Sequence, residues 1–354
     1  MPPRERLGSG SFPMRILIAT DAWHPQINGV VRTLTTVVRE LGSLGHEVEV
    51  IGPERFPSVP MPSYPEIRVA VAPGRRVAKL MDELRPDAVH IPVEGPIGLA
   101  ARRHCLRRRW PFTTSYHTRA GLYFQEKFGV PNDLVLALQR WFHNAGNGFM
   151  VQTDSLEREL RGKGFANIRR WCRGVDTELF KPVSVDGFLD LPRPIFTYVG
   201  RVSAEKNLGD FLTLDLPGTK LVVGDGPQLA EYRQRFPGVV FAGWKQGEDL
   251  SRYYSASDVF VMPSRFETFG LVLLEALACG VPVAAYPVHG PVDVIGKAPV
   301  GVLDHDLRQA ALRALSIPRR ACRDFATRFS WRRSAEEFVG NLMPIRRLRQ
   351  RTVG

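Results

Sequence analysis

The sequence is poor in cysteine and has no long unbroken apolar run. The cysteines of its 354 residues are Cys105, Cys172, Cys279 and Cys322. They form no C-x-x-C pair, so neither a disulfide framework nor a thiolate zinc site is expected, and a reduced, cytoplasmic compartment fits best. The longest apolar stretch, 271–288, is interrupted by Glu275, Gly280 and Pro282, whereas a spanning helix needs about 20 apolar residues. We therefore expect no segment that crosses a bilayer.

Several functional motifs are also missing. Gly8-Ser9-Gly10 lies before the first predicted strand instead of after it, so the nicotinamide fingerprint is absent. The sequence contains no helix-turn-helix, zinc-finger or RNP pattern and no cluster of metal ligands. No unit of about 20–50 residues repeats. These absences argue against a dehydrogenase, a nucleic-acid-binding protein, a metalloenzyme and a solenoid.

Acidic residues are outnumbered by basic ones. The chain has 48 Lys and Arg against 36 Asp and Glu, a net charge of +12, which indicates an anionic partner. Nucleic acid, an anionic membrane surface and phosphorylated small molecules all carry the required charge. Hydrophobic residues make up 44% of the chain, enough for ordinary globular cores.

The length is about twice that of a usual domain, which predicts two domains. Residues 1–13 are basic and have no apolar core, so we interpret them as a disordered extension rather than a secretory signal. The first domain is predicted over 14–180. The second is predicted over 181–330 and opens with a Pro- and Gly-containing linker, 181–194. Residues 331–354 are expected to form a helix that crosses back to the first domain, followed by a basic tail.

Short β-rich runs alternate with helical stretches in both domains. After the first run, apolar residues recur at helical spacing from Val30 to Leu44, and Gly45 ends the helix. The predicted strands are 15–20, 48–53, 67–72, 88–92, 112–117 and 148–153 in the first domain, and 195–200, 220–226, 239–243, 258–263, 281–286 and 300–303 in the second. This pattern predicts two doubly wound α/β domains. Ligands of such sheets bind outside the carboxyl ends of the strands, so the loops there should carry the function.

Two of these loops have residues suited to an anionic ligand. Gly29 opens the first apolar helix, where backbone amides can bind an anion, although a plain turn glycine is the alternative interpretation. Arg201 and Lys206 follow the first strand of the second domain. A fixed guanidinium and a mobile ammonium suit a diphosphate, and solvated surface cations are an equally good interpretation.

A third loop, within 262–283, holds Glu267 and then a helix that starts near Gly270 and contains Glu275. Eight residues of helix span about 12 Å, so the two carboxylates would contact different parts of one extended ligand. Open backbone amides at 269–271 would face an anion. Burying Glu275 among leucines without a partner is costly, so we expect it to reach the ligand cleft.

These motifs together resemble a known enzyme family. The segments INGVVRTL (27–34), VGRVSAEKN (199–207), VVGDGP (222–227) and ETFGLVLLEALACGVPV (267–283) resemble retaining, nucleotide-sugar-dependent glycosyltransferases of family four, which have the GT-B fold. EGPIG (94–98), TSYHTR (114–119) and RGVDTELFKP (173–182) further resemble the subgroup that glycosylates membrane lipids. The resemblance covers about residues 14–341 and implies two Rossmann-like domains facing a central cleft.

The resemblance implies a role for each matched donor-side residue. Arg201 and Lys206 would bind the donor diphosphate, Glu267 the sugar hydroxyls and Glu275 the ribose. The residues expected to bind the donor are Gly29, Gly200, Arg201, Lys206, Gly224, Gly226, Lys245, Glu267, Phe269, Gly270, Leu271 and Glu275. Those expected to take part in catalysis are His117, Arg201, Lys206 and Glu267. For His117, a structural histidine at a strand end is the alternative interpretation.

The acceptor is expected on the first domain. Asp21, Glu94 and Arg119 are placed towards it, with ordinary loop charges as the alternative. The basic and partly apolar segment 100–110 suits anionic lipid headgroups, and a solvated helix face is its alternative interpretation. Its expected membrane contacts are Arg102, Arg103, Arg107, Arg108, Arg109 and Trp110. The basic stretch 346–351 would add to this contact or form a disordered end.

The expected function is retaining transfer of a hexose, with glucose or glucuronate favoured, from a UDP-linked sugar to a lipid such as diacylglycerol. The enzyme would act as a peripheral protein on the inner face of the cytoplasmic membrane. Neither a cofactor nor a metal is expected, because cations and helix amides can stabilise the leaving diphosphate. A GDP-mannose-dependent α-mannosyltransferase and a soluble GT-B transferase with a sugar or small polar acceptor are the alternatives. Nucleic acid is not expected as a partner, and the oligomeric state stays open.

Overall fold

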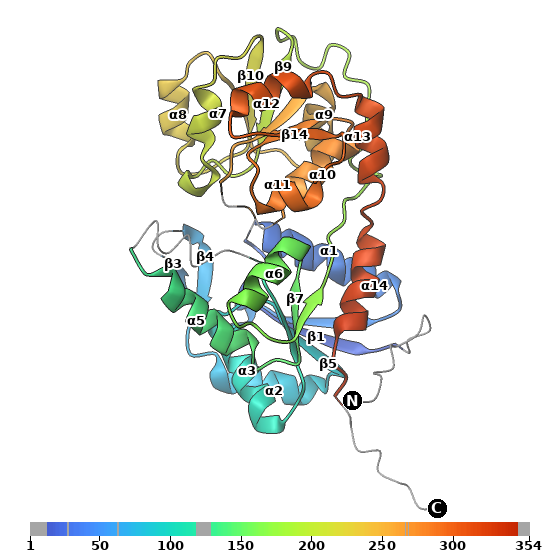
Figure 1. The fold of residues 1–354 in the computed structure, drawn as a ribbon. Coiled ribbons are helices and arrows are strands. Elements are labelled where there is room, and N and C mark those ends of the chain that lie inside the picture. The colour runs from blue at the N-terminus through green and yellow to red at the C-terminus, as the bar shows by residue number, and fades with distance from the viewer. Residues whose placement is uncertain are drawn as a thin grey trace, which may run out of the picture. The chain divides into compact units, whose positions relative to one another are not determined.

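The computed structural model describes residues 13–26, 28–61, 64–117, 129–265, 267 and 269–345, which form two compact units. The first unit contains the described residues up to Gln152, residues 156–172 and those from Trp331 on. The second contains residues 153–155 and 173–330. Each unit has a sheet flanked by helices (Figure 1). Arg119, the tail 346–351 and residues 1–12 of the expected extension lie outside the described residues.

The first unit is built on a parallel sheet in the order β2-β1-β5-β6-β7-β8. Its strands are β1 (Arg15–Ala19), β2 (Glu47–Ile51), β5 (Ala88–Ile91), β6 (Thr113–Ser115), β7 (Gly148–Val151) and β8 (Ile168–Arg170). Its helices are α1 (Gly29–Ser43), α2 (Gly74–Leu84), α3 (Pro96–Arg108), α5 (Asn132–His143), α6 (Asp154–Gly162) and α14 (Trp331–Asn341), with a 3-10 turn η1 (Pro53–Arg55).

Both faces of this sheet are buried. Ile16 and Ile18 of β1 pack in a core with α1 and α14, whereas Leu17 and Ala19 pack in a second core with α2 and α3. A central parallel strand covered on both sides must be apolar at consecutive positions, which explains the run ILIA. The helix α14 lies against α1, so the end of the chain contributes to the first unit.

One predicted strand of the first domain lies outside the parallel sheet. The run 67–72 falls in β4 (Tyr64–Ala70), which pairs antiparallel with β3 (Ser58–Met61) in a separate ribbon. Arg68 donates to the carbonyl oxygen of Ser58 at 2.6 Å, and Val59 and Val71 are about half exposed. The alternation of Arg and Val in this run is therefore that of a half-exposed two-stranded ribbon, not that of a buried parallel strand. Strand β8 was not predicted because two of its three residues are arginines.

The second unit is built on a parallel sheet in the order β11-β10-β9-β12-β13-β14. Its strands are β9 (Ile195–Val199), β10 (Thr219–Val223), β11 (Val240–Gly243), β12 (Val259–Met262), β13 (Val283–Ala285) and β14 (Gly301–Leu303). Its helices are α7 (Leu208–Leu212), α8 (Leu229–Arg235), α9 (Gly247–Ala256), α10 (Leu271–Ala278), α11 (His289–Val294), α12 (Leu307–Ala314) and α13 (Arg319–Ala326), with a 3-10 turn η2 (Ala204–Lys206). All strands predicted for this domain are confirmed.

The two strand orders confirm doubly wound, Rossmann-like sheets. In the first sheet, consecutive strands are added on one side of β1 and then, from β5 on, on the other side. In the second sheet the reversal falls between β9 and β12. Loops at the carboxyl ends of such neighbouring strands diverge to opposite faces and leave room for a ligand. The candidate site therefore lies at these two reversals, each within its own unit.

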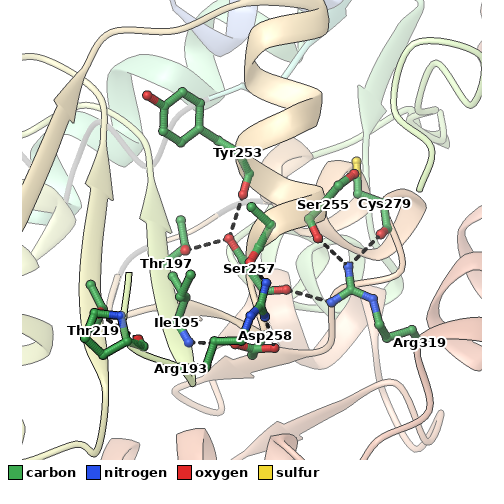
Figure 2. A network of polar contacts seen from close by, with 12 residues as sticks. Arg193, Ile195, Thr197, Thr219, Tyr253, Ser255, Ser257, Asp258, Cys279 and Arg319 are labelled. Carbon is green, nitrogen blue, oxygen red and sulfur yellow. Dashed lines mark hydrogen bonds and ion pairs between the residues drawn. The ribbon is translucent and has the colours of Figure 1, made fainter. Parts of the chain in front are cut away.

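The amino ends of the second sheet are tied together by side chains (Figure 2). Asp258, before β12, accepts from Arg193 at 2.6 Å and from the backbone amide of Ile195 at 2.7 Å. Arg319 donates to the carbonyl oxygens of Ser257 and Ser255 at 2.7 and 2.8 Å. Residues 181–194, predicted as a linker, thus end in contacts with the second unit. The amino edge is fixed by polar contacts, and the carboxyl edge carries the candidate site.

Arg323 of α13 should be a strong stabilising contact of the second unit. It donates to the carbonyl oxygens of Phe180, Ala278 and Thr177 at 2.7, 3.0 and 2.9 Å. Removing the guanidinium leaves three carbonyls without this charged donor, so we expect Arg323→Met to lower the free energy of unfolding by about 2 kcal/mol. Arg320→Met is the matched control, because its side chain is 92% exposed. Urea denaturation measures both variants, and equal midpoints would contradict the assignment.

Candidate functional site at the carboxyl ends of the two sheets

In the first unit, Asp21 follows β1 and holds the start of α3. Its carboxylate accepts from the backbone amides of Ile97 and Gly98, both at 3.0 Å. Burial, reinforced by the charge of Glu94, raises the pKa of Asp21 to about 6 although these two amides lower it. A Cβ atom added at Gly95 would lie 2.3 Å from the Asp21 carboxyl carbon. Asp21, expected on the acceptor side, is therefore positioned by a helix terminus.

Glu94 follows β5, the strand next to β1. One of its carboxylate oxygens accepts from Gln139 Nε2 at 2.9 Å and is 3.0 Å from His143 Nε2. Burial raises the pKa of Glu94, but the hydrogen bonds from His143 and Gln139 outweigh it and hold the pKa below its usual range. Helix α5 thus fixes the second residue that was expected on the acceptor side. His143 and Gln139 were not found from the sequence.

His117 belongs to a chain of hydrogen bonds that runs through the sheet. His90, on β5, is fully buried, with Nδ1 2.9 Å from Thr113 Oγ1 and Nε2 3.1 Å from Ser115 Oγ. Ser115 Oγ lies 2.8 Å from His117 Nε2. The rings of His90 and His117 both meet Trp171 edge to face. His90 could not be found from the sequence, because a lone histidine in a strand is usually structural.

The direction of this chain fixes the position of the protons. The Thr113 hydroxyl donates its single proton to the Val89 carbonyl at 3.4 Å, so it accepts from Nδ1 of His90. Nε2 of neutral His90 then accepts the Ser115 proton, and Ser115 in turn accepts from Nε2 of His117. The geometry therefore favours the Nε2-protonated tautomer of His117.

Gly29 is the first residue of α1, as predicted. Asn28 precedes it, and its side chain oxygen accepts from the backbone amides of Val30 and Val31 at 3.0 Å each. These two amides already have a hydrogen-bond acceptor. The helix terminus therefore has fewer amides available to a ligand than the sequence suggested. A Cβ atom added at Gly29 would meet no atom of the protein within 4 Å. Glycine at this position is thus not demanded by packing within the unit.

In the second unit, two predicted residues meet directly. Lys206 Nζ lies 2.9 Å from a carboxylate oxygen of Glu267, and the two side chains are 30% and 14% exposed. The charge of Glu267 raises the pKa of Lys206. Lys206 follows β9 and Glu267 follows β12, the neighbouring strands at which the order of this sheet reverses. Residues 61 positions apart are brought together by the pairing of β9 with β12.

Asn207 holds this arrangement in place. Its backbone is left-handed, with φ 53°, and its side chain donates to the Pro263 carbonyl at 3.3 Å and to Asp210 at 2.6 Å. Asp210 also accepts from Arg265 at 2.8 Å and from Tyr286 at 2.7 Å. The loop after β9 is thus bound to the loops after β12 and β13. Asn207 belongs to the EKN motif, whereas Asp210 was not found from the sequence.

The glycine turns after β9 and β10 pack backbone against backbone. Gly224 has φ 152°, and a Cβ atom there would lie 1.8 Å from the carbonyl oxygen of Gly200. A Cβ atom at Gly226 would lie 2.4 Å from the carbonyl oxygen of Val202, which belongs to the same loop as Gly200. These glycines were predicted to bind the donor. The fold itself requires them, because they allow the loops after β9 and β10 to pack directly against each other.

Helix α10 begins at Leu271 after Gly270, whose φ is +84°, and no described side chain caps it. Phe269 is 8% exposed. Within the helix, Glu275 is 3% exposed and accepts from the Tyr254 hydroxyl at 3.1 Å. The buried carboxylate therefore has the polar partner that its burial requires.

The two other predicted cations of the second unit lie on loops after the strands. Arg201 is partly exposed, and its backbone carbonyl accepts from the Tyr198 hydroxyl at 2.7 Å, which fixes the turn that carries it. Lys245 follows β11, and its ammonium lies 5.7 Å from the centroid of the Tyr253 ring. Both residues thus stand at the same sheet edge as Lys206.

The arginines of α3 do not form one exposed patch. Arg102 is 8% exposed, its guanidinium lies 3.8 Å from the centroid of the Trp141 ring, and it donates to the carbonyls of Trp141 and Phe142. The prediction that Arg102 contacts lipid is therefore wrong, because helix periodicity turns it towards α5. Trp110 is only partly exposed. The arginines that remain exposed are Arg103, Arg107, Arg108 and Arg109.

Two family profiles match most of the chain. The profile of Glycosyltransferase Family 4 matches residues 27–179, and that of Glycosyl transferases group 1 matches residues 193–316. A GDP-mannose-dependent alpha-mannosyltransferase of Corynebacterium glutamicum is 30% identical over 82% of this chain and 76% of its own length. The chain belongs to glycosyltransferase family 4.

Other relatives agree with this membership. A GDP-mannose-dependent alpha-mannosyltransferase of Mycobacterium tuberculosis is 28% identical over 94% of this chain and 97% of its own length. An alpha-monoglucosyldiacylglycerol synthase of Streptococcus pneumoniae is 25% identical over 85% and 78%. The fold is similar to that of sucrose-phosphate synthase from Thermosynechococcus elongatus, with a TM-score of 0.74, 20% identity and coverage of 92% and 97%. The enzyme is thus a hexosyltransferase of the GT-B fold.

Two further observations concern the described part of this glycosyltransferase. No helix there is long and apolar enough to cross a membrane. No group of three or more His, Cys, Asp or Glu residues there is arranged to hold a metal ion. The role of each candidate residue in catalysis, and independence from metal, stay predictions.

The hydrogen-bond chain predicts the tautomer of His117 in the glycosyltransferase. With ¹⁵N-labelled histidine, NMR should show the Nε2-protonated form for His117 in the wild type. In Ser115→Ala the acceptor for this proton is lost, so the signal should shift towards a mixture of tautomers. The exposed His305 is the internal control and should not change. An Nδ1-protonated His117 in the wild type would contradict the chain.

Proposed function

We propose that this glycosyltransferase moves a hexose, with retention of the anomeric configuration, from a nucleoside-diphosphate sugar to a hydroxyl of a membrane lipid. The observation that supports this most is the Lys206–Glu267 pair at the strand reversal of the second unit, 2.9 Å apart. An ammonium suits a diphosphate and a neighbouring carboxylate suits sugar hydroxyls. A nucleoside-diphosphate sugar carries both groups on adjacent atoms.

The donor half supplies positive charge for the leaving diphosphate. Lys206 keeps its proton because Glu267 raises its pKa, and Arg201 lies on the same loop. The amino end of α10, uncapped by described side chains, adds backbone amides. These groups stabilise the charge that develops as the bond between the anomeric carbon and the phosphate oxygen breaks. Metal is not needed for this role.

The transfer step needs no enzymatic nucleophile. The acceptor oxygen forms a bond to the anomeric carbon on the face that the diphosphate leaves. The electron pair of the broken bond goes to the phosphate oxygen, which also takes the proton of the acceptor hydroxyl. His117 would contact the sugar, and Glu275 would hold the ribose. The hydroxyl of Tyr254 keeps Glu275 oriented for that role.

The relatives favour GDP-mannose as the donor. Two of the relatives above are named as GDP-mannose-dependent alpha-mannosyltransferases and match most of this chain. This reverses the preference for a UDP-linked glucose or glucuronate. The UDP-hexose and diacylglycerol pair is the second candidate, supported by the similarity to alpha-monoglucosyldiacylglycerol synthase.

A donor panel tests the two candidates. Purified enzyme is incubated with GDP-mannose, UDP-glucose, UDP-galactose or UDP-glucuronate and a bacterial lipid extract or diacylglycerol, and lipids are analysed by mass spectrometry. A mannolipid formed from GDP-mannose is the expected product. A glucolipid from UDP-glucose would support the second candidate, and transfer only to soluble sugars would contradict a lipid acceptor.

Loss of a donor-binding cation should abolish most of the transfer. We expect Lys206→Ala and Arg201→Ala each to lower kcat about 100-fold or more, because a cation that stabilises the leaving diphosphate is lost. Lys181→Ala is the matched control, since Lys181 is an exposed lysine of the same unit whose ammonium lies 3.7 Å from the exposed carboxylate of Glu178. EDTA should leave the wild-type rate unchanged. Near-normal turnover of Arg201→Ala or Lys206→Ala, or loss of activity with EDTA, would contradict this mechanism.

A further inference from the structure

Helix α5 of the first unit exposes a row of large apolar side chains. Leu134, Leu138 and Trp141 are 55%, 59% and 56% exposed. Their spacing of four and three residues places them on one face of the helix. Leu136, on the opposite side, and Phe142, next to the row, are buried in the cores of the unit. The helix therefore has two apolar faces, and only one of them is needed for folding.

Helix α3 continues this exposed row. Leu99 and Leu106 are 40% and 47% exposed and, at seven residues apart, stand about 20° from each other around the helix axis. Arg102 lies between them in sequence, on the side that faces α5. Its guanidinium stacks on the Trp141 ring at 3.8 Å and binds the Trp141 carbonyl at 3.0 Å. The stack joins the leucines of α3 and the apolar face of α5 into one surface.

Exposed cations border this surface on its α3 side. Arg103 and Arg107 are exposed and follow Leu99 at four and eight residues, so they stand about 40° and 80° further around the helix. Arg140 is exposed on α5. A soluble surface rarely groups five large apolar side chains, and flanking arginines are typical of segments that insert into the headgroup region of anionic bilayers.

We propose that the α3–α5 surface, consisting of Leu99, Leu106, Leu134, Leu138 and Trp141 with Arg103 and Arg107, docks on an anionic lipid bilayer. This rests on the proposed lipid acceptor, which would be presented at such a surface. A second copy of the chain fits less well, because a two-fold contact pairs the surface with itself, and the surface so defined contains arginines but no carboxylate to face them. The occupant is therefore a membrane, reached by the apolar face of α5 and not by a row of arginines on α3 alone.

Vesicle flotation without nucleotide sugar or acceptor tests this surface separately from catalysis. Wild-type protein should float with vesicles of phosphatidylcholine and phosphatidylglycerol, and less with phosphatidylcholine alone. The triple variant Leu134→Ser, Leu138→Ser, Trp141→Ser should lose at least about tenfold in binding, since its apolar contact is removed. Arg103→Glu with Arg107→Glu should lose binding to anionic vesicles selectively.

The control replaces exposed apolar residues outside the α3–α5 surface with serine. Val71 and Leu315 are 49% and 39% exposed, so Val71→Ser with Leu315→Ser should bind vesicles like the wild type. If the triple variant fails to fold, Trp141→Phe provides a second test: quenching of tryptophan fluorescence by brominated lipid should fall in this variant.

Three outcomes would overturn the proposal. They are failure of the wild type to bind anionic vesicles, unchanged binding by the triple variant, and a lipid-independent shift from dimer to monomer in that variant, which would assign the surface to a second copy. None of these outcomes bears on hexose transfer itself. Conversely, vesicle binding by an enzyme that glycosylates only soluble acceptors would leave the surface standing and contradict the lipid acceptor.

Discussion

The parallel pairing of β9 with β12 is the constraint on which the donor half depends. It places the loop with Lys206 beside the loop with Glu267, and the pair forms at 2.9 Å. Asn207 then binds the second loop through the Pro263 carbonyl, and the glycine turn at Gly224 lets the neighbouring loop approach. A partly buried ion pair contributes little net stability once its desolvation is counted. The pair instead holds the Lys206 ammonium and the Glu267 carboxylate in position for a ligand that carries a diphosphate next to hydroxyls.

The first unit uses the same sheet geometry with different chemistry. The loops after β1, β5 and β6 carry Asp21, Glu94 and His117, and each side chain is held by groups from another element. Asp21 binds the start of α3, and Glu94 binds α5. His117 is oriented through Ser115 and His90, and the His90 ring also packs on Phe338 of α14, with centroids 4.8 Å apart. Helix α14, the last helix among the described residues, thus supports a residue at the candidate site.

Much of the fold could be predicted because buried parallel strands leave a plain pattern: β1 is apolar at every position from Ile16 to Ala19, and β9 is apolar except for the buried Thr197. The ribbon of β3 and β4 could not be distinguished from such strands in the sequence, since the run around Val69 is short and contains both apolar and charged residues. Motifs located Lys206, Glu267 and Glu275, but the partners His90, Asp210 and Tyr254 come from distant segments, and only folding brings them near. The charge of Arg102 suggested exposure, whereas its stacking on Trp141 depends on a helix some 40 residues later. The apolar face of α5 was hidden for the same reason: its sequence shows apolar residues but not which of them stay uncovered.

Calorimetric titration with GDP measures directly whether Lys206 binds the donor diphosphate, because it needs neither the acceptor nor turnover. We expect GDP to bind to the wild type and guanosine to bind far more weakly. Lys206→Met should lower the affinity for GDP at least about tenfold through loss of its contact with the diphosphate. The affinity for guanosine should not change in this variant. Equal affinity of wild type and Lys206→Met for GDP would contradict the assignment of the Lys206–Glu267 pair to the donor diphosphate.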